Sequence, residues 1–221
     1  MSVRQKIPFD SGLFFITFTC SHWLPLFELT SSYDLVYKWF DYLKQQGHYI
    51  NAYVIMPNHI HAIIGFRKSN KSINEIIGDG KRFISYDIVK RLKEQNHTDI
   101  LLQLSNHVNK TDAERKKKHK IFETSFDWKL IYTDKFMFQK MDYIHLNPCR
   151  SKLLLINDPI DYVFSSALNY TLESKSNYEI TPIGEMKHID LTIPLPQRAL
   201  QDTAAGTTKH HAVWCPRRRL P

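Results

Sequence analysis

Apolar residues follow two different periods along the first 170 residues of the chain. Four short segments rich in β-branched and aromatic residues predict strands, at 13–20, 49–56, 59–66 and 128–132. Pro57-Asn58 separates the second segment from the third and is a turn signal. Residues 49–66 therefore predict a β-hairpin.

Helical spacing of apolar residues predicts three longer helices, at 33–46, 73–95 and 134–147. Pro148 predicts the end of the third helix, because a residue before proline disfavours helical backbone. Residues 161–170 predict one more short helix. The polar segment 96–120 predicts an exposed loop or a short helix.

The predicted order is strand, helix, strand, strand, helix, strand, helix. Helices interleaved with hairpin-connected strands favour an α+β fold, with a ferredoxin-like antiparallel sheet and helices packed on one face. The periodic signal fades from about residue 174, where prolines become frequent. We therefore expect one domain before this point and a C-terminal extension at 172–221 that is poorly ordered at its end.

The charge balance changes the range of partners to consider. The net charge is +8 and the isoelectric point is about 9.3, which suggests a polyanionic partner. No run of about 20 apolar residues predicts a membrane span. Three scattered cysteines predict neither a disulfide framework nor a cysteine-rich zinc site. We expect a cytoplasmic protein with reduced thiols.

Two histidines lie inside a predicted strand. His59 and His61 are separated by one residue, so both imidazoles project from the same face of the sheet. Ile60, Ala62 and Ile64 then face the other way, toward a core. Two imidazoles on a rigid strand can begin a divalent-metal site, although a solvated sheet face explains an isolated pair equally well.

The third predicted helix carries a second group of polar residues. Tyr143 and Asn147 are four residues apart and share one helical face. A tyrosine hydroxyl can attack a phosphodiester and form a covalent intermediate. The Asn147 amide oxygen would be a hard third ligand for Mg²⁺ or Mn²⁺ beside the two histidines. The alternative is that Tyr143 packs against the sheet and Asn147 caps the helix.

These segments resemble a known family. YINAYVIMPNHIHAIIGF at 49–66 is similar to the metal-binding hairpin of the HUH single-tyrosine transposases, and YIHLNP at 143–148 is similar to their tyrosine helix. Further agreement is found in FFITFTC, LPLF, FETSFDWKLI and DYVFSSALNY. The resemblance therefore spans about 9–171 and implies a tyrosine transposase domain with these bounds. An asparagine four residues after the tyrosine favours the REP-associated branch, because some other relatives use glutamine as the third ligand.

The resemblance implies an HUH endonuclease-type fold and a role for each matched residue. His59, His61 and Asn147 are expected to bind Mg²⁺ or Mn²⁺, and Tyr143 is expected to be the nucleophile. The implied activity is cleavage and joining of single-stranded or hairpin DNA through a phosphotyrosine. Family members occur as monomers and as dimers that exchange tyrosine helices, so a homodimer is possible.

Basic residues predict where DNA binds. Arg150 and Lys152 follow the tyrosine helix, and Lys81 and Arg82 lie on the predicted helix 73–95. We assign these four residues to DNA binding, and Arg150 and Lys152 rank above the basic run at 115–120, which is typical of a solvated surface.

Two other functions fit the same sequence. A host-adopted protein could bind DNA hairpins without cutting them, although an intact Tyr143 argues against this. A structural zinc protein or an unrelated metalloenzyme would need further Cys or His ligands near the pair. His22, His48 and His145 lack the usual zinc spacing to it.

Overall fold

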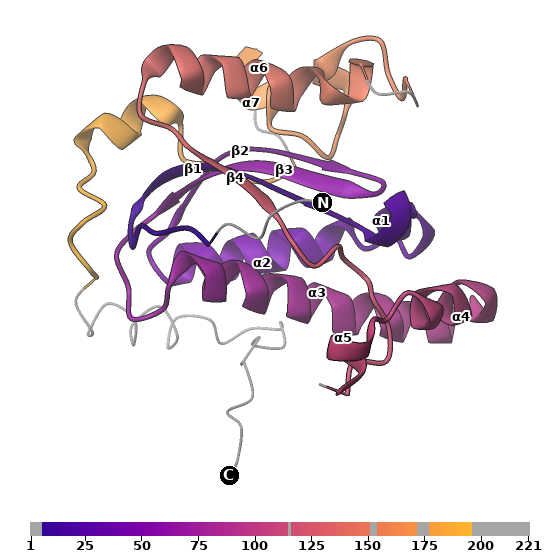
Figure 1. Cartoon of the computed structure of the whole chain (residues 1–221). Helices are drawn as coiled ribbons and strands as arrows, with labels where there is room; N and C mark the ends of the chain where they lie inside the picture. The colour runs from indigo at the N-terminus through magenta and orange to yellow at the C-terminus, as the bar shows by residue number, and fades with distance from the viewer. Residues whose placement is uncertain (1–5, 115, 151–153, 172–176, 196–221) are drawn as a thin grey trace, which may run out of the picture.

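A four-stranded antiparallel sheet forms the centre of the computed structural model (Figure 1), which describes residues 6–114, 116–150, 154–171 and 177–195. The strand order is β2–β3–β1–β4, which is the order of a ferredoxin-like sheet. The strands span Gly12–Thr19 (β1), Tyr49–Met56 (β2), His59–Phe66 (β3) and Asp127–Leu130 (β4). The predicted strands and hairpin are confirmed.

Helices cover both faces of this sheet (Figure 1). Helices α2 (Tyr33–Gln45) and α3 (Ile73–Glu94) lie on one face, and α6 (Asp134–Arg150) lies on the other. The α+β class is confirmed, but the expected packing of all helices on one face is corrected for α6. The strands are apolar on both sides: Phe14 and Ile16 join the α2–α3 core, while Phe15 and Ile63 join a second core under α6.

Helix α6 continues through Pro148 to Arg150, three residues beyond the predicted end. Proline removes one backbone donor and crowds the preceding turn, at a cost of about 3 kcal/mol in a helix interior. Here the proline lies close to the end of the helix, and both Pro148 and Ile144 one turn earlier are buried. Burial of this apolar stripe, with Met137 and Met141, offsets the loss. Asn147 is therefore a helical residue and not a helix terminus.

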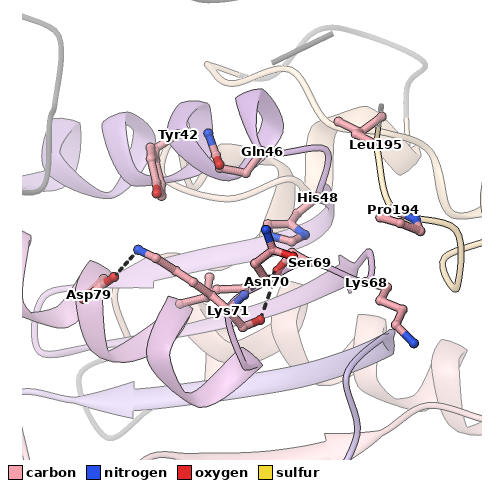
Figure 2. Close-up of a pocket in the computed structure, with 11 residues that line it drawn as sticks. Tyr42, Gln46, His48, Lys68, Ser69, Asn70, Lys71, Asp79, Pro194 and Leu195 are labelled. Atoms are coloured by element: carbon pink, nitrogen blue, oxygen red, sulfur yellow. Dashed lines mark hydrogen bonds and ion pairs between the residues drawn. The ribbon is translucent and has the colours of Figure 1, made fainter. Parts of the chain in front are cut away.

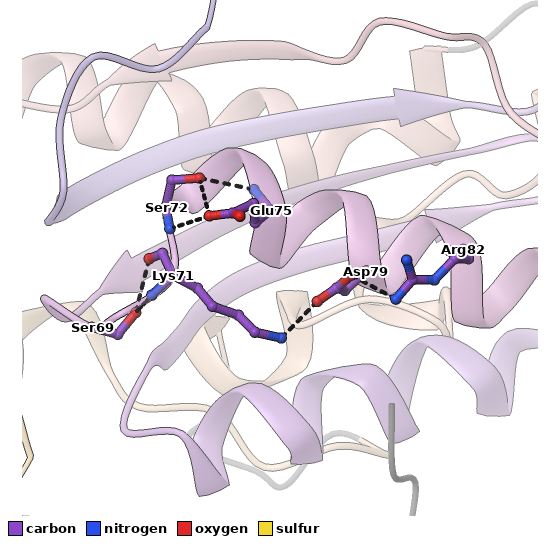
Figure 3. Close-up of polar contacts among 6 residues, drawn as sticks. All are labelled: Ser69, Lys71, Ser72, Glu75, Asp79 and Arg82. Carbon is purple, nitrogen blue, oxygen red and sulfur yellow. Dashed lines mark hydrogen bonds and ion pairs between the residues drawn. The ribbon is translucent and has the colours of Figure 1, made fainter. Parts of the chain in front are cut away.

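The start of α3 is fixed by polar contacts (Figure 3). Ser72 and Glu75 form a reciprocal capping box, in which the Ser72 side chain accepts from the Glu75 backbone and the Glu75 carboxylate accepts from the Ser72 backbone. Asp79 then pairs with Lys71 at 2.7 Å and Arg82 at 2.8 Å. Two backbone donors at the start of α3 and the carboxylates of Glu75 and Asp79 therefore already have partners within the chain.

Shorter elements connect the main layers. They are a 3₁₀ turn at Ser21–Trp23, α1 (Leu26–Leu29), α4 (Thr98–Asn106), α5 (Lys110–Glu114), a 3₁₀ turn at Pro159–Asp161, α7 (Ala167–Thr171) and a 3₁₀ turn at Ile183–His188. The short helices α4 and α5 account for most of the polar segment predicted as a loop or short helix. Within the described residues, no helix is long and apolar enough to cross a membrane.

Chain segments from the C-terminal part cover the free edge of β2. The Ile55 backbone donates to the Phe164 carbonyl at 2.9 Å, and the Thr181 backbone donates to the Ile50 carbonyl at 2.8 Å. Ile180 and Ile183 are buried. The described part of the predicted extension, 177–195, therefore packs on the domain and protects an edge that could otherwise pair with another strand.

Candidate active site on the face covered by α6

His59 and His61 lie side by side on β3, beneath α6. Their ring centroids are 4.7 Å apart, and the side chains are only 8% and 5% exposed. Ile60, Ala62 and Ile64 point into the opposite core, as the strand alternation predicted. The solvated-face interpretation of the pair is wrong, because α6 covers this face of the sheet.

Each imidazole already has a polar partner at its Nδ1 atom. Thr17 lies opposite His61 in the β1–β3 register, and its Oγ1 is 2.6 Å from His61 Nδ1. Asn58 Oδ1 is 2.7 Å from His59 Nδ1 and can only accept there, so Nδ1 of His59 carries the proton. Partners of this kind orient metal-binding histidines and leave Nε2 as the ligand atom.

Burial keeps both imidazoles neutral. It lowers the pKa of His59 to about 4, and the nearby Asn147 side chain partly offsets this effect. Burial also lowers the pKa of His61 well below its usual value, and His59 and the Lys140 ammonium lower it further. A neutral imidazole is the form that binds a metal ion, so no proton has to leave either ring near neutral pH.

Helix α6 places Tyr143 directly beside this pair. The Tyr143 ring lies 5.0 Å from the His61 ring and 5.9 Å from the Phe15 ring, edge-on to both. Its side chain is 47% exposed, so a ligand can reach the hydroxyl. Because α6 packs on its own sheet, one chain brings Tyr143 and both histidines together. Whether the protein forms a homodimer stays a prediction.

Asn147 supplies an oxygen with no partner of its own. Its Oδ1 is buried and receives no hydrogen bond from any described residue. A buried acceptor without a partner is costly, and such atoms often face an ion or water. Since Asn147 also interacts with His59, its amide oxygen and the two Nε2 atoms fit a hard divalent cation.

In the described residues, His, Cys, Asp and Glu side chains alone do not form a metal site. No group of three or more His, Cys, Asp or Glu side chains able to hold a metal ion occurs in the part of the chain that the structure describes. The set that fits a metal here is thus two imidazoles and one amide, which differs from the four His or Cys ligands of a structural zinc site.

Lys140 is a site residue that the sequence reasoning missed. Its ammonium lies 4.8 Å from the centre of the Phe15 ring, 5.2 Å from Phe136 and 5.6 Å from Tyr143. Its spacing of three residues before Tyr143 was a usable signal, because residues i and i+3 share a helical face. Thr17 could not be found this way, because only the β1–β3 register pairs it with His61.

The basic residues assigned to DNA binding have different surroundings. Arg150 is exposed at the last position of α6, whereas Lys152 lies outside the described residues. The Lys81 ammonium donates to the carbonyls of Glu123 at 2.6 Å and Ser125 at 3.3 Å, and burial lowers its pKa to about 8.

This geometry gives Lys81 a structural role on α3, across the sheet from Tyr143. Arg82 also lies on α3, where it pairs with Asp79 (Figure 3). We therefore leave Lys81 and Arg82 out of the DNA surface proposed below.

A cavity of about 370 Å³ lies elsewhere, between the end of α2 and the connection from β3 to α3 (Figure 2). His48, Lys68 and Lys71 contribute to its lining, and none of the four predicted catalytic and metal residues does. Lys71 is already paired with Asp79 there. The histidine pair, and not this cavity, carries the chemistry of interest.

Comparison with known structures agrees with this fold. The chain matches the structure of a REP-associated tyrosine transposase bound to a REP hairpin, with a TM-score of 0.55 over 76% of this chain and 84% of that one. The chain has the fold of a REP-associated tyrosine transposase. Sequence identity over that match is 17%, so the likeness establishes the fold alone.

Other comparisons add little to the tyrosine transposase likeness. A candidate transposase from Deinococcus radiodurans R1 is 14% identical over 65% of this chain and 95% of its own, at a TM-score of 0.37 that supports no argument. No family model matches the chain, and no curated protein matches it by sequence.

Thr17 offers a test of the candidate metal site that leaves all the expected ligands in place. Thr17→Val removes the hydrogen bond to His61 Nδ1, so we expect about 10- to 100-fold weaker Mn²⁺ binding, measured by calorimetry. Thr19→Val is the matched control, because it removes a hydroxyl from the same strand face. Equal affinities for Mn²⁺ in Thr17→Val and the unaltered chain would contradict the assignment.

Proposed function

We propose that this chain is a metal-dependent DNA-nicking and strand-transfer enzyme that acts on single-stranded or hairpin DNA. The observation that carries the proposal is the approach of Tyr143 to within 5.0 Å of the His61 ring, ring centre to ring centre, next to the unpartnered oxygen of Asn147. The fold shared with a tyrosine transposase bound to hairpin DNA supports the choice of substrate.

The proposed reaction conserves the energy of the broken bond. The Tyr143 hydroxyl oxygen attacks a phosphorus atom of the DNA backbone and releases its proton. The bond from that phosphorus to the leaving deoxyribose oxygen breaks, and this oxygen takes up a proton to become a free hydroxyl. A hydroxyl of another DNA end then attacks the phosphotyrosine, which joins the strands and restores the tyrosine.

The protein groups around Tyr143 have separate roles in this proposal. A divalent cation, Mg²⁺ or Mn²⁺, held by His59, His61 and Asn147 would act as a Lewis acid toward the phosphate when bound. Lys140, over the Tyr143 ring, offsets phosphate charge beside the nucleophile. Arg150, exposed about two helical turns after Tyr143 on α6, contacts the DNA backbone.

The experiment that tests the proposal is adduct formation. Labelled single-stranded DNA from a library of hairpins is incubated with the protein in Mg²⁺ or Mn²⁺ and separated on denaturing gels. We expect a covalent protein–DNA band that a chelator abolishes. Hairpin binding without any adduct, across the whole library and with both ions, would instead establish a hairpin-binding protein that does not cut.

A further inference from the structure

Aromatic rings form a continuous row across the sheet face that carries Tyr143. The Trp23 ring meets His59 at 5.6 Å, His59 meets His61 at 4.7 Å, and His61 meets Tyr143 at 5.0 Å, between ring centres. The row continues through Phe15 and Lys140 to Phe136, which stacks with Tyr132 at 6.1 Å. The row begins at Trp23 and ends at Tyr132.

The two ends of the row are unusually open for large apolar rings. Trp23 is 63% exposed and Tyr132 is 79% exposed, whereas Phe15 in the middle is buried. Exposed tryptophan and tyrosine rings are favourable stacking platforms for nucleic-acid bases, which all have a flat apolar face. Neither ring is needed to fill a core.

The backbone holds Trp23 in this open position. His22 and Trp23 both have positive φ angles, 53° and 58°, which residues other than glycine rarely adopt. The Asn58 side chain donates to the Trp23 carbonyl at 3.2 Å, and Glu123 accepts from the His22 backbone at 3.1 Å. Strained backbone held by surrounding contacts often marks ligand-binding positions. Asn58 thus contacts both the Trp23 backbone and the His59 imidazole.

The two exposed rings lie beyond opposite ends of β1. Trp23 follows the end of β1, and Tyr132 follows Ile131, whose backbone donates to the carbonyl of Leu13 near the start of β1. Figure 1 shows α1, which follows Trp23 in the chain, beyond one end of the sheet, and the first turn of α6, which follows Tyr132, near the other end. From Leu13 to Thr19 the strand extends roughly 20 Å. At about 3.4 Å per stacked nucleotide, this length accommodates roughly six nucleotides.

Positive charge accompanies the row. Lys140 lies within it, and Lys129 is opposite Phe15 in the β1–β4 register, so its exposed side chain starts from the same sheet face. Single-strand binding surfaces combine stacking rings with cations that follow the phosphates. A double helix, whose bases are already paired and stacked, would leave the two exposed rings without a base to cover them.

We propose that one DNA strand crosses this face along the ring row, with bases on either side of the reacting phosphate stacked on Trp23 and on Tyr132. The inference rests on the proposed function, because Tyr143 between the two rings defines the reacting phosphate. It adds that the enzyme requires single-stranded nucleotides on both sides of the cleaved position.

The test measures binding without cleavage. Tyr143→Phe protein in chelator is titrated with a labelled hairpin that carries six unpaired nucleotides on each side of the cleavage position, or none. We expect Trp23→Ala and Tyr132→Ala each to weaken binding of the flanked hairpin about 5- to 100-fold. Trp23→Phe and Tyr132→Phe should retain most of the affinity, and the hairpin without flanks should lose little.

A control variant on the opposite side of the sheet and a readout that does not depend on cleavage distinguish failure of this inference from failure of the proposed function. Tyr86 is 71% exposed on α3, across the sheet, so Tyr86→Ala should bind like the parent chain. Unchanged affinity in Trp23→Ala and Tyr132→Ala, or an equal loss in Tyr86→Ala, would overturn the ring row. Because no cleavage is measured, a ring-dependent affinity would stand even if the unaltered chain formed no adduct.

Discussion

Replacing Tyr143 with phenylalanine is expected to abolish the covalent protein–DNA adduct while hairpin binding stays close to that of the unaltered chain. Phenylalanine keeps the ring that contacts His61 and Phe15 and removes only the hydroxyl oxygen that would bond to phosphorus. Binding is measured by fluorescence anisotropy, and the adduct is measured on denaturing gels with the same DNA.

Tyr132→Phe is a matched control for this experiment, because it removes a hydroxyl from an exposed tyrosine on the same face. We expect that variant to form the adduct. Persistence of the adduct in Tyr143→Phe, with its loss in another tyrosine variant, would show that a different residue is the nucleophile.

Replacing His61 with alanine is expected to reduce the metal-dependent adduct to background and to weaken Mn²⁺ binding by about 100-fold or more, beyond the loss expected for an orienting partner. The physical reason is the loss of one of the two proposed imidazole ligands, which burial keeps neutral. Calorimetric titration with Mn²⁺ and denaturing gels measure the two effects separately.

Because His61 is buried, the effect of its substitution on folding has to be distinguished from the effect on metal binding. His61→Gln keeps much of the side-chain volume and should retain the thermal unfolding midpoint better than His61→Ala, yet bind Mn²⁺ weakly. His48 is also buried, but it lies before the start of β2, so His48→Gln should leave Mn²⁺ affinity unchanged. Full metal-dependent adduct formation by a folded His61 variant would remove His61 from the metal site.

Strand periodicity was sufficient to predict one half of the site. The alternation in β3 put His59 and His61 on one face and Ile60 on the other, and the structure agrees. Helical spacing likewise predicted that Tyr143 and Asn147 share a face, and both lie close to the histidines. These predictions hold because residue spacing alone determines which side chains share one face of a strand or helix.

The position of α6 could not be predicted from the same patterns. An apolar strand looks alike whether one or both of its faces are covered, so Phe15 and Ile63 gave no sign of a second core. The proline rule also failed at Pro148, since burial of the surrounding stripe outweighs one lost backbone hydrogen bond. The position of α6 and its continuation through Pro148 both depend on contacts between residues that are far apart in the sequence.

Charge was the least informative signal in the sequence. Lys81 and Lys140 both lie on helices, yet Lys81 binds backbone carbonyls of the segment before β4, and Lys140 lies over the Tyr143 ring. Trp23 could not be placed on the surface from sequence, because its exposure depends on two consecutive positive φ angles. Only the fold distinguishes a structural cation or ring from one available to DNA.

The most direct measurement of the central claim is mass spectrometry of the protein–DNA adduct after digestion with trypsin and nuclease. Cleavage after Lys140 and Arg150 releases residues 141–150, MDYIHLNPCR, in which Tyr143 is the sole tyrosine. We expect a phosphonucleotide mass on Tyr143 in this peptide, formed only with Mg²⁺ or Mn²⁺. The same peptide without any addition, recovered from an established covalent adduct whose DNA maps to another residue, would contradict the account.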